Sequence, residues 1–489
     1  MIQPDWLVRQ AAVRPRHEAI IAREGAVDFQ TLEARVGRRA ARLADCRRGA
    51  RVGVVLDAGV PLVETLLACL RMGRSAVLID PRLGQAEARP LVEAATPVVV
   101  VGGGETSDLA RDLADHVDAE LQLLDEDGGR TGRPAPAQGV DLDAEAVVVF
   151  SSGTSGRPKP VALTAGNLLW SALASAARLG SHPADRWLAC LPLSHVGGLS
   201  VVFRSVLFGT TLVLQRGFDE GAVRSSLAAD AISLISLVPT TLGRLLDGAG
   251  LSAPALRCAL IGGASAPIDL LERARAAGVP AAPTYGMTET ASQVATLPPG
   301  EEPGETGRVG CPLLPTEVQI RGDDHACLPV GEIGHIMVRG PTVAPGASGP
   351  DGWLRSDDLG RLDARGALTV LGRRDDVIVT GGENVSPAEV EAVLGGCVAV
   401  AEVGVAAVPD ARWGQVVGAW VVPCPGERPT LEQLRAACDG RLAPHKRPRR
   451  LFLTESLPRT ALGKLRRAEL AALARRGGEV GSGDGDVSP

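Results

Sequence analysis

The sequence lacks the features that mark several special protein classes. Aromatic residues make up only 3% of its 489 residues, and there is a single Tyr. No uncharged apolar run reaches about 18 residues, the length that a membrane-spanning helix needs. The first residues, Met1 to Trp6, contain no apolar signal segment. We therefore expect a globular protein with no membrane span and no secretory signal.

The sequence also lacks paired-cysteine motifs and a net positive charge. The nine cysteines form no C-x-x-C pair, which excludes a zinc ribbon or a dithiol redox motif, and their scatter favours a reducing cytoplasm. The net charge of −6 argues against nucleic-acid binding as the main task. The basic cluster His445 to Arg450 is a local exception, typical of a solvated surface.

Short apolar runs alternate with helical patterns through the N-terminal part of the chain. This rhythm predicts a largely parallel sheet covered by helices. The expected strands lie at 51–56, 75–79, 97–101, 146–150, 212–214, 232–238 and 257–261, and the expected helices at 61–72, 219–228, 241–247 and 268–277.

The pattern changes twice towards the C-terminus. From about 305 to 372, short strands and Gly/Pro/Asp turns predict an antiparallel, barrel-like subdomain. After a break at 372–376, a compact α+β unit is expected over 376–476. We thus expect an α/β fold with a large N-terminal domain over 1–372, a small mobile C-terminal domain and a disordered tail over 477–489. Within the smaller unit, strands are expected at 377–379, 398–408 and 418–422 and helices at 387–394 and 431–442. In the large N-terminal domain, an exposed or disordered loop is expected at 128–139.

One Ser/Gly-rich stretch runs from Ser151 to Lys159 and reads Ser-Ser-Gly-Thr-Ser-Gly-Arg-Pro-Lys. It follows an apolar strand and precedes a helical pattern from about Asn167. Glycines allow close approach of the backbone, hydroxyls and N–H groups donate, and the cations neutralise charge, so such a loop suits a polyphosphate. The P-loop pattern of the NTPases is absent. Taken alone, the stretch is equally consistent with a flexible surface turn.

Six further motifs occur in order along the chain. They are Leu191-Pro-Leu-Ser-His-Val-Gly-Gly-Leu199, Gly262-Gly-Ala-Ser-Ala-Pro267, Tyr285-Gly-Met-Thr-Glu-Thr290, Arg355-Ser-Asp-Asp-Leu-Gly360, the stretch from Gly372 to Asn384, and Pro458-Arg-Thr-Ala-Leu-Gly-Lys464. With the Ser/Gly loop, this set resembles the acyl-adenylate-forming superfamily over nearly the whole chain. Within it, the stretch from Leu191 to Thr296 and the downstream Gly-Gly-Glu-Asn-Val-Ser-Pro are most similar to the o-succinylbenzoate–CoA ligases of menaquinone synthesis.

The resemblance implies a reaction in two halves. A carboxylate attacks the α-phosphorus of ATP and expels pyrophosphate, and the CoA thiol then attacks the acyl-adenylate and releases AMP. The resemblance also implies Mg²⁺. A carboxylate is a poor nucleophile towards the negatively charged ATP, so the site must position it and neutralise the phosphate charge. The implied substrates and cofactor are therefore a small carboxylic acid, ATP, CoA and Mg²⁺.

Most of the implied site residues bind the nucleotide. The loop residues expected to hold the phosphates are Ser151, Ser152, Gly153, Thr154, Ser155, Gly156 and Lys159. The resemblance places adenine between two sides of the site. Tyr285 and the adjoining Gly286 form one side, and Gly262, Gly263 and Ala264 form the opposite wall. It assigns Thr288 to the α-phosphate, Glu289 to Mg²⁺, and Asp358 and Arg373 to the ribose. Lys464 would reach the carboxylate and the α-phosphate. Singly, Tyr285 would more often be a core residue, Glu289 a helix-start carboxylate and Lys464 a solvent-exposed cation.

The remaining implied residues serve the hinge, the thiol and the acid. Asp375 falls at the hinge about which the small domain turns, and Gly381-Gly382-Glu383 form the turn beside CoA. His195 resembles the gate of the acyl site. Ser200, Arg204 and Ser292 form a candidate pocket for the second carboxylate of o-succinylbenzoate, since a buried carboxylate needs donors or a cation. Arg204 could equally be a solvated helix residue.

The sequence departs from the family pattern in three places. Pro160 stands where Gly usually follows the loop Lys, Asp357 adds a carboxylate before Asp358, and the segment Gly340–Trp353 is short. These departures leave room for two alternatives: an adenylating enzyme of another pathway that loads CoA or a separate carrier protein, and an inactive nucleotide-binding protein. The sequence does not indicate the oligomeric state.

Overall fold

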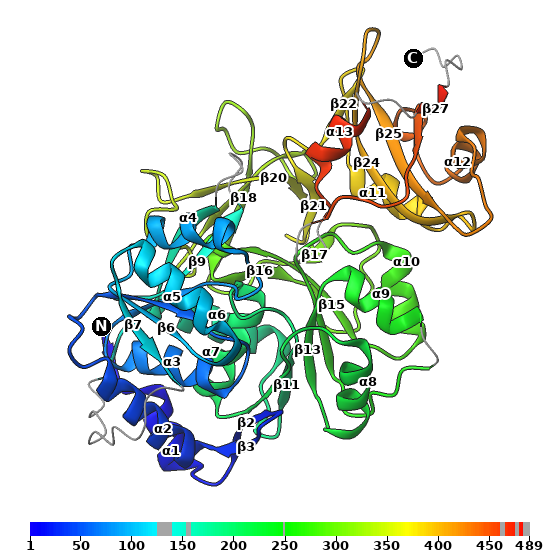
Figure 1. The fold of residues 1–489 in the computed structure, drawn as a ribbon. Helices are drawn as coiled ribbons and strands as arrows, with labels where there is room; N and C mark the ends of the chain where they lie inside the picture. The colour runs from blue at the N-terminus through cyan, green and yellow to red at the C-terminus, as the bar shows by residue number, and fades with distance from the viewer. Residues whose placement is uncertain (125–138, 153–157, 248–249, 460–464, 475–478, 483–489) are drawn as a thin grey trace.

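The structure is a computed structural model that describes residues 1–124, 139–152, 158–247, 250–459, 465–474 and 479–482. Two helix-covered sheets form the large body, a third sheet lies beside them, and a small unit stands at one end (Figure 1). This arrangement confirms the α/β fold class expected from the sequence. Within the described ranges, no helix has both the length and the apolar character needed to cross a membrane.

The first sheet is parallel except at one edge. Its order is β10-β9-β5-β4-β6-β7, and β10 joins β9 in an antiparallel hairpin. Valines on both faces of these short strands explain why helices cover both sides. The strands are β4 (Arg51–Val55), β5 (Ser75–Leu78), β6 (Val99–Gly102), β7 (Glu120–Leu123), β9 (Glu145–Ser152) and β10 (Pro158–Thr164).

The second sheet is also mainly parallel, in the order β16-β15-β14-β13-β11-β12-β2-β3. Its antiparallel ends are the pairs β15–β16 and β2–β3. The strands are β2 (Glu18–Ala22), β3 (Gly25–Asp28), β11 (Arg186–Ala189), β12 (Thr211–Leu214), β13 (Leu234–Leu237), β14 (Cys258–Ile261), β15 (Ala281–Met287) and β16 (Ser292–Thr296).

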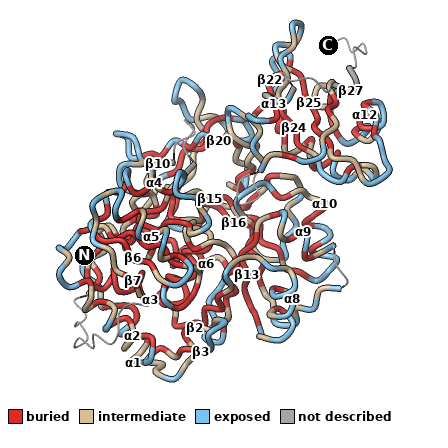
Figure 2. Tube along the Cα trace, in the orientation of Figure 1, coloured by how far each residue is buried: buried red, intermediate tan, exposed pale blue. Residues whose placement is uncertain are grey.

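The two sheets share one layer of helices, so the large body has five layers. The largest core joins strands of both sheets through α2 (Phe29–Arg42), α3 (Val60–Arg71), α6 (Ala165–Leu179) and α7 (Val196–Phe208). The outer face of the first sheet is covered by α4 (Gln85–Ala95) and α5 (Ser107–His116). The outer face of the second is covered by α8 (Glu220–Ala229), α9 (Pro239–Asp247) and α10 (Ile268–Ala276). Buried residues accordingly run along the strands of both sheets (Figure 2).

A five-stranded antiparallel sheet occupies the region where the sequence pattern changes. Its order is β17-β21-β20-β19-β18, and its core includes Tyr285 and Val294 from the second sheet. Trp353 lies in the short segment directly before β20. The centroid of its ring is 5.0 Å from the guanidinium carbon of Arg321 and 4.5 Å from that of Arg339. The strands are β17 (Arg308–Gly310), β18 (Glu317–Arg321), β19 (Gly334–Arg339), β20 (Leu354–Leu362) and β21 (Leu368–Arg373).

The small C-terminal unit has cores of its own. Around β25, the Trp420 and Phe452 rings stack with centroids 4.6 Å apart, and a second cluster lies under α11 and α12. The Ser386 hydroxyl donates to the Leu371 carbonyl of β21 at 2.5 Å and so joins the unit to the large body. Its elements are β22 (Ile378–Thr380), β23 (Glu383–Val385), α11 (Pro387–Leu394), β24 (Val400–Asp410), β25 (Gly414–Pro423), α12 (Leu431–Ala437), β26 (Arg450–Leu453), α13 (Arg467–Ala474) and β27 (Glu479–Ser482).

Three local expectations need correction. Pro158–Thr164 forms β10, so a hairpin and not a direct strand-to-helix turn follows Ser151. Glu479–Ser482 forms β27 against β26, which corrects the expected disordered tail for these residues. The helix expected over 431–442 ends at Ala437. The remaining tail residues, 477–478 and 483–489, and all but the last residue of the expected loop at 128–139 lie outside the described residues.

We predict that Trp420→Ala unfolds the small unit selectively. Trp420 is 1% exposed, and emptying so large a site costs about 3–5 kcal/mol. Because the large body has separate cores, differential scanning calorimetry should show one transition moving to lower temperature while the other stays. Trp170→Ala, at a ring position 40% exposed on α6, is the control. A uniform shift of all unfolding would contradict the independence of the two parts.

Candidate active site

The candidate site residues gather where the carboxyl ends of parallel strands meet the five-stranded sheet. Ser151 and Ser152 end β9, and Tyr285 lies near the end of β15. The short helix η2 (Thr288–Thr290) that follows β15 packs against both β9 and β10. Ligands of α/β proteins bind at this edge of a parallel sheet, so the fold brings together motifs that are far apart in the chain.

Both ends of the phosphate-loop motif lie in the β9–β10 hairpin. Ser151 lies opposite Lys159 and Ser152 opposite Pro158, so both ends of the motif are in the stem. The four residues Gly153, Thr154, Ser155 and Gly156 lie outside the described residues. Lys159 is exposed and lies in the second ladder pair from the turn.

The proline that departs from the family pattern lies in the stem of this hairpin. Pro160 lies opposite Phe150, in a strand at the edge of the first sheet. Edge strands tolerate proline, since one side of the strand has no ladder partner. Pro160 therefore removes an N–H donor from the stem of the hairpin.

The candidate adenine wall and Tyr285 come from adjacent parallel strands. Gly262, Gly263 and Ala264 follow β14, which pairs with β15. Gly263 has φ of +80°, a conformation that a side chain would strain. At Gly286, a Cβ would lie 1.7 Å from the Ser292 carbonyl oxygen, so β16 leaves no space for any other residue.

The strongest polar contact of the site joins Tyr285 to the candidate ribose carboxylate. The Tyr285 hydroxyl donates to Asp358 Oδ2 at 2.7 Å, and Asp358 lies opposite Arg373 in the β20–β21 ladder. Burial and the Asp358 charge raise the pKa of Tyr285 well above its usual value, which keeps the hydroxyl a donor. The Ser356 hydroxyl accepts the Asp358 N–H at 3.3 Å and donates to the Ile336 carbonyl, which fixes the backbone of β20.

The extra carboxylate before Asp358 points away from it. Successive side chains of a strand alternate between faces, and Asp357 is exposed while Ser356 is buried. The Asp357 carbonyl accepts the Arg374 N–H at 2.7 Å, so its main chain serves the segment that leads to the small unit. Asp357 therefore adds no charge on the face of β20 that carries Asp358.

The Thr-Glu-Thr motif has an unusual backbone. Ala291 and Ser292 have φ of 52° and 116°, and the Thr290 hydroxyl donates to the Met287 and Ser292 carbonyls. Such strain is concentrated at ligand sites, where the surrounding contacts enforce it. Thr288 and Glu289 remain partly exposed beside the hairpin root. Among the residues that the structure describes, no cluster of three or more acidic, His or Cys side chains could enclose a metal.

Glu289 therefore fits Mg²⁺ better than a metal held by a full protein cage. Mg²⁺ keeps several waters and binds through one or two carboxylates together with substrate phosphates. A single carboxylate next to the phosphate hairpin satisfies that requirement.

The candidate acid pocket surrounds a buried arginine. Arg204 is 2% exposed on α7, its Nη2 lies 3.5 Å from Ser292 Oγ, and its guanidinium carbon lies 5.0 Å from the centroid of the Trp187 ring. Its Nε and Nη1 have no hydrogen-bond partner in the described part of the chain. Burial lowers the pKa of Arg204 to about 9. The alternative of a solvated helix residue is wrong.

Ser200 and His195 complete the helix-facing side of this pocket. Ser200 is buried one turn before Arg204, with its hydroxyl 3.4 Å from the Gly197 carbonyl. His195 is the N-cap residue of α7, and its burial lowers its pKa below the usual value. The structure thus places His195, Ser200, Arg204 and Ser292 along one helix and the strand that it faces.

The small unit carries the hinge and thiol-side candidates. Asp375 lies between β21 and β22, and Gly381 and Gly382 turn between β22 and β23 with φ of 59° and 88°. Glu383, the first residue of β23, is exposed at this turn. Lys464 lies outside the described residues.

Two groups near the site were missed by sequence reasoning. The Trp413 carbonyl accepts the Gly381 N–H at 3.1 Å, and the Arg449 guanidinium carbon lies 4.6 Å from the Trp413 ring centroid. Asp80, after β5, accepts a hydrogen bond from Ser194. A polar residue directly after a parallel strand was the available signal for Asp80, whereas Trp413 had no local signal.

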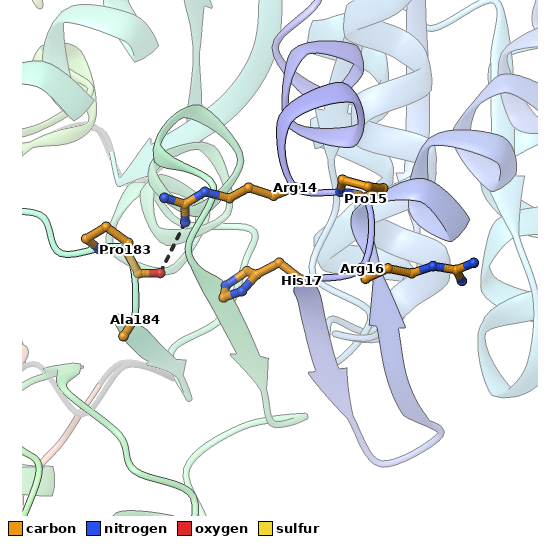
Figure 3. A pocket seen from close by; sticks show the side chains of 6 residues that line it. All are labelled: Arg14, Pro15, Arg16, His17, Pro183 and Ala184. Atoms are coloured by element: carbon orange, nitrogen blue, oxygen red, sulfur yellow. Dashed lines mark hydrogen bonds between the residues drawn. The ribbon is translucent and has the colours of Figure 1, made fainter.

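A surface hollow elsewhere belongs to none of these groups. It is lined by Arg14, Pro15, Arg16, His17, Pro183 and Ala184, beside β2 and far from β20 and β21 (Figures 1 and 3). Arg14 donates to the Pro183 carbonyl at 3.2 Å across it, a contact that braces two backbone segments. The hollow holds no residue of the site.

Comparisons with known proteins give one consistent family. Residues 7–346 match the AMP-binding enzyme model, and residues 389–464 match its C-terminal domain. The 2-succinylbenzoate–CoA ligase of Bacillus subtilis strain 168 is 38% identical, covering 97% of this chain and 99% of that protein. The enzyme of the same name from Geobacillus strain WCH70 is 36% identical, with 96% and 97% covered.

Solved structures agree with these matches. The Bacillus subtilis o-succinylbenzoate CoA synthetase bound to its acyl-adenylate intermediate has a TM-score of 0.88 at 36% identity, covering 96% of this chain and 98% of that one. A double mutant of that enzyme, bound to a product analogue, has a TM-score of 0.73 at 37% identity and the same coverage. ATP-bound MatB from Rhodopseudomonas palustris has a TM-score of 0.86 at 26% identity, with 96% and 99% covered.

We predict that two neighbouring carboxylates of β20 differ sharply in nucleotide binding. Asp358→Asn removes the charge that accepts the Tyr285 hydroxyl and should weaken ATP binding at least tenfold, as expected for a charged hydrogen bond worth about 1.5–3 kcal/mol. Asp357→Asn, on the opposite face, should leave binding within about twofold, because an exposed charge interacts weakly. Calorimetric titration with ATP measures both. Equal losses would mean that the ribose site lies elsewhere.

Proposed function

Because this chain belongs to the AMP-binding enzyme family, we propose that it is an ATP-dependent acid–CoA ligase acting on 2-succinylbenzoate in menaquinone biosynthesis. It forms an acyl-adenylate with release of pyrophosphate, then an acyl-CoA thioester with release of AMP. The observation that carries the substrate assignment is the buried Arg204 beside the candidate nucleotide site, whose Nε and Nη1 have no hydrogen-bond partner among the described residues. Full-length similarity to enzymes named for this activity supports it.

In the first half-reaction, the chain binds ATP across its sheet edges. The β9–β10 hairpin holds the β- and γ-phosphates, and Tyr285 borders adenine. Asp358 accepts hydrogen bonds from the ribose hydroxyls, and Arg373, opposite it in the ladder, reinforces this contact. Thr288 donates to the α-phosphate. Glu289 would hold Mg²⁺, which supplies charge neutralisation at the phosphates. Lys464 steadies the attacking carboxylate and the α-phosphate.

The acid has two carboxylates, of which only one reacts. The spectator carboxylate on the ring needs a buried partner. Arg204 offers two nitrogens, Nε and Nη1, that have no hydrogen-bond partner among the described residues and are shielded from water. With its pKa at about 9, Arg204 stays charged at neutral pH. An incoming carboxylate therefore completes an ion pair that the free enzyme lacks, with Ser200 and Ser292 as hydroxyl neighbours.

The second half-reaction requires the small unit to turn about Asp375. A lower whole-chain TM-score to the product-analogue complex of the Bacillus subtilis enzyme, 0.73 against 0.88 for its acyl-adenylate complex, supports such a turn. Turning brings Gly381, Gly382 and Glu383 towards the thiol. Trp413 and Arg449 lie beside this turn, where an aromatic face and a cation suit the nucleotide end of CoA.

We also assign the enzyme to the cytoplasm. ATP and CoA are available there, and all nine cysteines are free thiols, several of them buried. Burial raises the pKa of Cys69, Cys190 and Cys258 to about 12, so these thiols are inert packing groups and not nucleophiles.

Product analysis tests the proposed function directly. The protein is incubated with ATP, Mg²⁺, CoA and 2-succinylbenzoate, beside a panel of benzoates and fatty acids, and the products are identified by mass spectrometry. Selective 2-succinylbenzoyl-CoA with one AMP per thioester is the expected result. AMP formed with another acid would overturn the substrate assignment and retain the ligase. An adenylate that forms without a thioester would indicate a carrier protein as acceptor, and no AMP with any acid would indicate an inactive protein.

We predict that Arg204→Met separates substrate recognition from stability. Loss of one partner of a buried charge pair costs about 2–5 kcal/mol, so kcat/KM for 2-succinylbenzoate should fall about 30-fold or more. The reaction of 4-oxo-4-phenylbutanoate, which lacks the ring carboxylate, should change little. Thermal stability should hold or rise, because an unpaired buried cation is removed.

Arg71→Met is the matched control for that variant. Arg71 is equally buried but bonds Asp5 and Glu33 at 2.8 and 3.1 Å, so its loss should destabilise the fold. If Arg204→Met left KM for 2-succinylbenzoate unchanged, Arg204 would not be the anchor of the ring carboxylate.

A further inference from the structure

A hydrogen-bond network centred on a residue outside the sequence motifs connects the two parallel sheets beside the candidate site. At its centre is Asp80, a residue only 9% exposed that follows β5. The parallel pairing of Ala76 with Val147 and of Val77 with Val148, continued along both strands, sets Asp80 level with Ser151. Asp80 therefore lies at the carboxyl edge of the first sheet, after the strand next to β9, which enters the phosphate hairpin.

Four donors fix the Asp80 carboxylate. Arg82 donates from its backbone N–H at 3.0 Å, from Nε at 2.9 Å and from Nη2 at 2.6 Å. The Ser194 hydroxyl donates to Oδ2 at 3.2 Å. A carboxylate held in this way has one orientation, and these hydrogen bonds lower its pKa, so it is ionised at neutral pH.

Ser194 belongs to the other sheet. It stands in the loop between β11 and α7, directly before His195. The loop packs tightly, because a Cβ at Gly198 would lie 2.5 Å from the Pro192 carbonyl oxygen. The hydrogen bond from Ser194 to Asp80 thus ties the start of α7, and with it His195, to the edge of the first sheet.

The charges of this network also reach His195. Burial lowers the pKa of His195, the Asp80 charge raises it, and the Arg82 charge lowers it. Arg204, on the same helix, instead faces Trp187 and Ser292. Asp80 is therefore the charge that opposes the effect of burial on this imidazole.

We propose that Asp80 is a positioning residue that holds His195 at the acyl site by anchoring Ser194. The inference rests on the proposed function and takes His195 as the gate of the acyl site that the family resemblance implies. In this role Asp80 has no direct contact with the acid, ATP or CoA and acts through Ser194. It sets where the imidazole stands relative to the phosphate hairpin, and its negative charge is part of the environment in which the imidazole gains and loses a proton.

Two variants separate the tether from the charge. Ser194→Ala removes the tether and keeps the charge, so turnover with 2-succinylbenzoate should fall roughly three- to tenfold, the rate factor of one ordinary hydrogen bond, with KM for ATP unchanged. Asp80→Asn removes the charge as well, so its loss should be at least as large. The acid limb of its pH–rate profile should move to lower pH, because His195 then protonates less readily, while Ser194→Ala leaves that limb in place.

The controls test whether both variants act through His195. Asp108→Asn, an exposed carboxylate on α5, should match the wild type in rate and pH profile. Adding Ser194→Ala to His195→Ala should cost nothing further, since coupled residues are not additive. The proposal would be overturned if the rate losses of Ser194→Ala and His195→Ala multiplied in the double variant. It would also be overturned if Asp80→Asn left the acid limb of the pH–rate profile in place, or if His195→Ala left turnover unchanged.

Failure of the proposed function would look different. A wild-type protein that shows no acid-dependent ATP–pyrophosphate exchange would refute the ligase before any variant is compared. If Asp80→Asn does not fold, as judged by its melting temperature, the comparison of Ser194→Ala with the double variant decides alone.

Discussion

The hydrogen bond from Tyr285 to Asp358 is the contact on which the geometry of the nucleotide site depends. It joins the second parallel sheet to the five-stranded sheet, two parts whose strands share no ladder at this point. The hydrophobic residues around Tyr285 hold its ring in place, and Ser356 holds the backbone of β20. Because a buried phenol and a carboxylate each need a polar partner, neither strand can shift without leaving one of them unsatisfied.

Much of the fold was predictable because its strands and helices are strongly periodic. The helix over 387–394 has the bounds that the sequence indicated, and most parallel strands of the large body agree within two residues. Pro158–Thr164 was missed because two prolines disguise an edge strand, which needs ladder partners on one side only. The pairing of β2 with β12 was invisible for another reason: their partners lie nearly two hundred residues apart, and no local pattern encodes that distance.

The candidate site was predictable where a motif carried it and not where three-dimensional packing did. Tyr285, Asp358 and Arg373, which the motifs singled out, lie together at one edge, but the sequence could not tell whether Arg204 was solvated or buried. The sequence placed an extra carboxylate, Asp357, directly before Asp358, but it could not show that strand alternation turns the Asp357 side chain outward. Asp80 escaped notice because its meaning depends on Ser194, which reaches it from the other sheet.

The slender connection of the small unit has a consequence for how such enzymes diversify. Its hydrophobic clusters contain no side chain from the large body among the described residues, and the Ser386 hydroxyl meets a main-chain carbonyl, an atom that every residue at that position supplies. Exchange of the C-terminal part between relatives by recombination would therefore leave both cores intact. Inheritance can thus vary the acid pocket of one part and the thiol-side surface of the other as separate modules.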